Sequence, residues 1–103
     1  MKLNILGVEY TLITDGTSVE FPDLTDDSDG YCNFQSKQIV ISKEYDDKTS
    51  DYAKYLDAVV RHEVVHAYLY ESGLHDYAND ELIVDWIALQ FPKMKKLFEE
   101  LNI

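Results

Sequence analysis

Two histidines in the second half of the chain are spaced so that they could share a metal ion. They belong to the stretch His62-Glu63-Val64-Val65-His66, which lies within a run of residues with helical character. On a helix, residues four apart lie on one face, so both imidazoles point the same way. Neutral imidazoles at this spacing can bind one divalent ion, most often zinc, and Glu63 is placed to take a proton from water at that ion. Two solvated histidines on a surface helix are the alternative interpretation.

A second, acidic motif could complete the site. A catalytic zinc usually has three protein ligands and leaves its fourth position to water. After fourteen intervening residues, His66 is followed by Glu81-Leu82-Ile83-Val84-Asp85, in which the two acids share one helical face and the other residues are apolar. Because an unpaired buried charge is costly, a metal and its histidine ligand would satisfy both carboxylates.

Together the two motifs, H-E-x-x-H and E-x-x-x-D, resemble those of the thermolysin-like gluzincins over about residues 55–90. The resemblance implies that Glu81 is the third metal ligand and that Asp85 bonds the far ring nitrogen of His62. It also implies a zinc peptidase in which Glu63 is the general base.

A looser similarity covers more of the chain. Gly30-Tyr31-Cys32, Ile39-Val40-Ile41 and the two motif helices are similar to small ImmA/IrrE-type and SprT-like metallopeptidase domains, many of them carried by phages and mobile elements. We therefore expect an α+β, zincin-like fold, with a small antiparallel sheet of about three strands packed on two to three helices. In such a domain, the edge of the strand around Tyr31–Phe34 or Ile39–Ile41 could receive a substrate backbone.

Length and composition favour a single soluble domain over residues 1–103. The hydrophobic fraction of 46% is ordinary for a globular chain of 103 residues with one modest core. A net charge of −11 and the lack of a long Lys/Arg cluster argue against direct nucleic-acid binding. The sequence has no signal-peptide core and no apolar run of about 20 residues, so we expect a cytoplasmic location and no membrane span. The lone cysteine, Cys32, fits a reducing compartment and is expected in the core.

The strands expected around the motifs lie in the first half of the chain. Residues 3–14 alternate in polarity as one strand, or as two strands with a tight turn at Gly7. Residues 15–29 contain six acids and no base, and we interpret them as a solvated loop. Residues 31–34 and 38–42 are expected to form an antiparallel pair.

The helices carry the motifs. An N-cap at Thr49 or Ser50 is expected to begin the first motif helix. The second motif helix, capped by Asn79 or Asp80, is apolar almost all round and is therefore expected to be buried. Pro92 is expected to end or kink this helix, and residues 93–102 to form a last amphipathic helix.

Peptide hydrolysis also requires a group that stabilises the oxyanion formed at the scissile carbonyl. His75 and Tyr77 are near both motifs in sequence and are our candidates for this catalytic role. Tyr31 and Tyr68 are also candidates. For each of these rings, a purely structural position is the alternative.

These features predict a zinc-dependent endopeptidase of narrow specificity. Its partner would be a protein or peptide substrate, with a single regulator protein as one candidate. The alternative function is a metal-stabilised protein-binding module or inhibitor without proteolytic turnover, because a chain of this size leaves little room for a substrate cleft. The sequence leaves the oligomeric state open.

Overall fold

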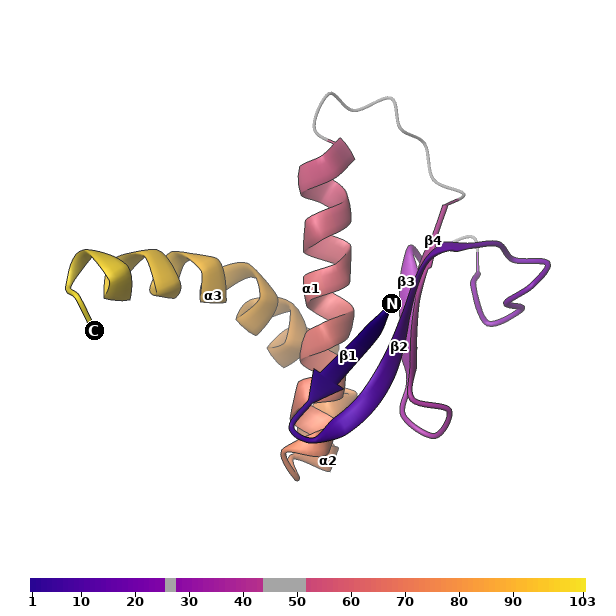
Figure 1. Cartoon of the computed structure of the whole chain (residues 1–103), viewed down its shortest axis with the longest axis horizontal. Helices are drawn as coiled ribbons and strands as arrows, with labels where there is room; N and C mark the ends of the chain where they lie inside the picture. Colours follow the sequence, from indigo (N-terminus) through magenta and orange to yellow (C-terminus); the bar gives the residue numbers. More distant parts are fainter. Residues whose placement is uncertain (26–27, 44–51) are drawn as a thin grey trace.

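The computed structural model describes residues 1–25, 28–43 and 52–103. The elements in chain order are the strands β1 (Lys2–Ile5), β2 (Val8–Gly16), β3 (Gly30–Asn33) and β4 (Gln38–Ser42) and the helices α1 (Tyr52–Glu71), α2 (His75–Ala78) and α3 (Glu81–Glu100). The expected α+β class is confirmed: Figure 1 shows the sheet on one side of α1, with α3 reaching away on the other. None of the described helices is long and apolar enough to cross a membrane. The N-cap expected at Thr49 or Ser50, and Asp26 and Asp27 of the acidic loop, lie outside the described residues.

The four strands form one mixed sheet in the order β1-β2-β4-β3. β1 and β2 are an antiparallel hairpin, and its turn residues Leu6 and Gly7 both have positive φ, 52° and 87°, as a type I′ turn requires. β3 and β4 form a second antiparallel hairpin. The turn expected at Gly7 and the antiparallel pairing expected within residues 31–42 are therefore confirmed.

One pair of strands differs from the expected sheet. β2 and β4 are parallel, so the sheet has four strands and is mixed, rather than having about three antiparallel strands. The reason lies in β4, where Ile39, Val40 and Ile41 are all fully buried, as is typical of a central strand covered on both faces. Such a strand needs a neighbour on each edge, and β2 occupies the edge that β3 leaves free. The backbone N–H of Lys43 accordingly donates to the carbonyl of Gly16 at 3.0 Å.

A core between the sheet and α1 fixes the helix that carries the histidines. Tyr10, Ile41 and Ala67 are among its fully buried members. The α1 side chains that pack against this core are Leu56, Val59, Val60 and Val64. Their spacing of three to four residues buries one face of α1 against the sheet. The adjacent face, with His62 and His66, is turned toward α2 and α3.

A smaller cluster joins α1 to α2 and α3, with Leu69, Ala78 and Val84 buried at its centre. The side chain of Asp80 accepts hydrogen bonds from the backbone N–H groups of the second and third residues of α3. The N-cap expected at Asn79 or Asp80 is therefore Asp80. This cap begins α3 at Glu81, beside the histidines.

α3 is far less buried than the sequence suggested. Only Val84 and Ala88 of its 20 residues are buried, whereas Leu82 is 80% exposed and Trp86 is 57% exposed. The expectation of a buried helix is wrong because α3 packs on α1 and α2 with only one side of its first half (Figure 1). The chain also remains helical through Pro92, so the last helix expected at residues 93–102 is the second half of α3.

Candidate metal centre

His62, His66 and Glu81 bring three donor atoms to one point. The Nε2 atoms of His62 and His66 are 3.2 Å apart. The Glu81 carboxylate places one oxygen 2.9 Å from His62 Nε2 and the other 3.0 Å from His66 Nε2. In a tetrahedral zinc site with bonds of about 2.0–2.1 Å, ligand atoms lie about 3.3 Å apart. The three observed separations are slightly shorter than that value, and two of them run to different oxygens of Glu81, so these groups lie close enough to share one ion.

Glu63 is the other carboxylate near the histidines. Its donor oxygen and one nitrogen from each histidine lie within 4.8 Å of one another. Glu63 Oε1 is 4.0 Å from His62 Nε2, farther than either Glu81 oxygen lies from its nearest imidazole. The side chain of Glu63 is 8% exposed, whereas that of Glu81 is 71% exposed. The distances favour Glu81 as the third ligand and leave Glu63 buried beside the site.

Burial sets the acidity of Glu63. Removal from solvent raises the pKa of Glu63 to about 7, with His66 lowering this pKa and Glu81 raising it to smaller extents. The burial comes partly from β3, because a Cβ added at Gly30 would lie only 3.4 Å from Cγ of Glu63. A carboxyl group in this environment can both accept and return a proton near neutral pH.

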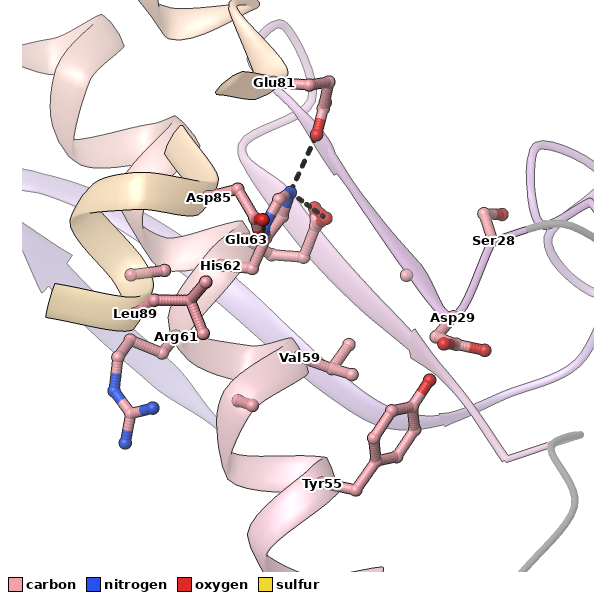
Figure 2. A pocket seen from close by; sticks show the side chains of 13 residues that line it. Ser28, Asp29, Tyr55, Val59, Arg61, His62, Glu63, Glu81, Asp85 and Leu89 are labelled. Atoms are coloured by element: carbon pink, nitrogen blue, oxygen red, sulfur yellow. Dashed lines mark hydrogen bonds and ion pairs between the residues drawn. The ribbon is translucent and has the colours of Figure 1, made fainter. Parts of the chain in front are cut away.

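Each histidine has an acceptor at its other ring nitrogen. Nδ1 of His66 donates to the carbonyl oxygen of Ala78, at the end of α2. Asp85 Oδ1 lies 3.3 Å from Nδ1 of His62. With the proton of each ring on Nδ1, both Nε2 atoms keep their lone pairs for a metal. Figure 2 shows His62 between the two acids that α3 supplies, Glu81 and Asp85.

Two cavities flank the donor atoms. The larger, of about 460 Å³, lies between α1, α3 and the segment that leads into β3 (Figure 2). Residues that line only this cavity include Asp29, Tyr55, Val59, Arg61 and Leu89. Those that line only the smaller cavity, of about 170 Å³, are Tyr31, Cys32, Phe34, His66 and Asn79. Gly30, Glu63 and Glu81 line both, so the two cavities meet beside the donor atoms.

His75 and Tyr77, the residues expected to stabilise an oxyanion, are not brought to the donor atoms. Neither lines either cavity. The His75 ring stacks on Tyr70 with 4.3 Å between ring centroids, and Tyr77 is 49% exposed. Because both rings are exposed and line neither cavity, their expected catalytic role is not supported by the geometry. Of the other two candidates, Tyr31 lines the smaller cavity and Tyr68 lines neither.

Two contributors to this site were not identified in the sequence. The first is the Ala78 carbonyl, for which no signal exists because every residue has a backbone carbonyl. The second is Asn79, which directly precedes the N-cap of α3 and lines the smaller cavity. Cys32 packs against the core, as expected, and also lines this cavity. Burial raises the pKa of Cys32 to about 12, so it remains a neutral thiol and is a poor metal ligand.

The chain has no significant match to a protein-family model, to a curated protein or to a solved structure. The role of this site is therefore inferred from its geometry. Two imidazole nitrogens and a carboxylate close together, with an acceptor behind each imidazole, could hold a divalent cation.

Proposed function

We propose that the chain is a zinc-dependent peptidase of narrow specificity, with a zincin-like arrangement of its helices and sheet. The observation that supports this most is the convergence of His62 Nε2, His66 Nε2 and the Glu81 carboxylate, at 2.9–3.2 Å from one another. These residues would hold the ion. Two imidazole nitrogens and one carboxylate oxygen in a tetrahedral arrangement are typical zinc ligands.

The reaction would use Glu63 as the proton carrier. Zinc, when bound, polarises a water molecule and lowers its pKa toward about 7. Glu63, buried beside the donor atoms, accepts the proton that this water loses as its oxygen attacks the scissile carbonyl. Glu63 then delivers the proton to the amide nitrogen as the C–N bond breaks. The products are a carboxylic acid, which holds the oxygen from water, and a free amine.

The edge of β3 is the proposed binding surface for the substrate backbone. The carbonyl of Asp29 accepts a hydrogen bond from the N–H of Ser42 at 2.8 Å, so these two residues form a hydrogen-bonded pair. Alternation along the antiparallel pair turns the N–H and C=O groups of Gly30 and Cys32 away from β4. Gly30 lines both cavities and Cys32 lines the smaller one. An extended peptide could pair with these groups and lie over the donor atoms, so we propose a protein or peptide substrate.

Elemental analysis of the purified chain tests the metal site. We expect a single zinc ion per chain in the unaltered protein and in Glu63→Gln. His66→Ala should lose the ion, because it removes a ligand that the Ala78 carbonyl orients. If His66→Ala kept its full zinc content, the proposed ligand set would be wrong.

Cleavage of a complex peptide mixture tests the reaction without knowledge of the substrate. The chain is incubated with peptides from a proteome digest, and new termini are identified by mass spectrometry. Glu63→Gln should retain zinc and lose cleavage by about 100-fold or more. Glu99→Gln makes the same chemical change on the exposed second half of α3 and should cleave normally. Equal rates for Glu63→Gln and the unaltered protein would refute the mechanism.

The alternative function, a metal-stabilised binding module or inhibitor, predicts a different set of results. Zinc would be present and would raise the thermal stability of the chain. No new termini would form, and a captured partner would stay intact with both the unaltered protein and Glu63→Gln. A partner that remains intact only with Glu63→Gln would instead support the peptidase.

A further inference from the structure

The second half of α3 extends away from the rest of the molecule (Figure 1). Ala88 is the last buried residue of α3, and every residue from Leu89 to Ile103, a range that is described throughout, is exposed or half-buried. We call residues 90–103 the arm. Its large apolar side chains remain in contact with solvent: Leu97 is 52% exposed, Phe98 44% and Leu101 58%.

We call the described residues before the arm the body. The apolar residues of the arm continue the face by which α3 packs on α1 and α2. Steps of four and three residues alternate through Ile83, Ile87, Gln90, Met94, Leu97 and Leu101, and all of these residues except Gln90 are apolar. Ile83 and Ile87 pack against the cluster between α1 and α2, whereas the later positions lie beyond it. Alternating steps of three and four residues are the heptad spacing by which one helix packs along another. We call the part of this face that lies on the arm, together with the flanking Phe91 and Phe98, the arm seam.

A helical segment as short as the arm needs another helix that packs along it. Isolated helices shorter than about 12–15 residues are marginal in water, and most helical stability in proteins comes from packing of an apolar face. Nothing among the described residues buries the arm seam. A second apolar stripe, Leu82, Trp86 and Leu89, is shorter, since Lys93 interrupts it at the next position. The arm seam is therefore the longer uncovered apolar face of α3.

We propose that the arm seam is a dimerisation surface, covered by the same seam of a second copy of the chain. A repeated three-and-four spacing is complementary to itself, as a two-fold symmetric interface requires. Four apolar residues of the seam, Phe91, Leu97, Phe98 and Leu101, are about half exposed, and Met94 is less exposed. With a side-chain surface of about 200 Å² at each position, a pair of seams would bury about 900 Å² in total, the size of a weak interface that forms only as the concentration rises.

The distribution of charge favours this occupant. Residues 90–103 carry three lysines and two glutamates, whereas the other 89 residues carry six basic and eighteen acidic side chains. Two copies of so acidic a chain repel one another over most of their surface. The arm, which carries one net positive charge, is where they can meet without that repulsion.

Sedimentation of the full chain over a range of concentrations tests the proposal. The unaltered protein should change from monomer to dimer as its concentration rises. Leu97→Glu places a charge in the centre of the seam and should raise the concentration for half-dimerisation by at least about tenfold. Lys96→Gln is the matched control, since it makes the net charge more negative by the same amount and lies about 100° from Leu97 and about 160° from Phe98 around the helix. This control should dimerise normally.

Folding of each variant is checked by its near-ultraviolet circular dichroism and its zinc content, both of which report on the body and not on the arm. Leu101→Gln, one turn farther along the seam, is a second variant that should also weaken the dimer. A chain that stays monomeric up to about 1 mM would overturn the proposal. A dimer that persists unchanged in both Leu97→Glu and Leu101→Gln would overturn it too, because the copies would then meet through another face.

Discussion

Asp85 Oδ1 lies 3.3 Å from Nδ1 of His62, while Glu81 Oε2 lies 2.9 Å from Nε2 of the same ring. Asp85 and Glu81 are four residues apart on one face of α3, so a single helix contacts both nitrogens of this histidine. The geometry of the candidate metal centre thus depends on how α3 packs against α1. The sheet packs on the adjacent face of α1 and supplies no donor atom to the histidines or to Glu81.

Asp85→Asn should weaken zinc binding without removing a ligand. The carboxylate accepts the Nδ1 proton of His62 and makes Nε2 a better donor, and the neutral amide does this less well. We expect the zinc dissociation constant to rise by about 10-fold to 100-fold. Titration against a competing chelator dye measures this change.

The matched control for this prediction is Asp76→Asn. Asp76 is exposed on α2 and lines neither cavity, so this change should leave zinc affinity unaltered. An Asp85→Asn variant that binds zinc as tightly as the control would show that Asp85 does not tune His62.

A partly buried ionic cluster at the last residue of α1 should make stability depend on pH. The Tyr10 hydroxyl donates to Glu71 Oε2 at 2.7 Å, and Lys37 Nζ lies 2.8 Å from the same oxygen. The hydrogen bond from Lys37, followed by that from Tyr10, lowers the pKa of Glu71 below its ordinary value of 4.5. An acid with a lowered pKa in the folded state contributes stability above its unfolded pKa and loses this contribution as pH falls through the folded pKa.

Glu71→Gln should therefore destabilise the metal-free protein at pH 7 but much less at pH 3.5. We expect a loss of about 1–2 kcal/mol at pH 7, since Lys37 remains partly solvated and screens the pair. Urea unfolding at the two pH values measures the difference. Glu9→Gln is the control: Glu9 pairs with Lys2 at 3.5 Å with both side chains at least 66% exposed, so its loss should have little effect. A destabilisation of Glu71→Gln that is equal at both pH values would exclude the ionic explanation.

The candidate donor set was predictable from sequence because it depends mostly on helix geometry. Residues four apart share a face, and this rule pairs His62 with His66 and Glu81 with Asp85 before any tertiary structure is known. The two pairs meet because α3 packs against α1, and Asp80, whose residue type signals an N-cap, begins α3 at Glu81. The Ala78 carbonyl could not be foreseen, because the acceptor belongs to the backbone and depends on the turn before α3.

The errors in the predicted fold come from properties that no single segment encodes. Hydrophobicity all around α3 suggested burial, but burial also needs neighbours, and α3 meets the body only along the side of Val84 and Ala88. The parallel pairing of β2 with β4 depends on which strands lie side by side in the sheet, and the sequence of one strand alone does not determine this. Its signal was the run Ile39-Val40-Ile41, since three consecutive buried side chains mark a central strand.

Gly30→Ala should disturb Glu63 while sparing the metal ligands. The added Cβ would lie 2.9 Å from the carbonyl oxygen of Val40, a backbone atom that cannot turn aside, so β3 must move. We expect a loss of about 1–2 kcal/mol, the cost of overpacking less the entropic gain of alanine over glycine. Because the ligands come from α1 and α3, zinc content should be unchanged, whereas cleavage should fall with the loss of packing over Glu63. Gln35→Ala, in the exposed turn after β3, is the control for stability, measured by urea unfolding. A Gly30→Ala protein as stable and as active as this control would show that β3 does not constrain Glu63.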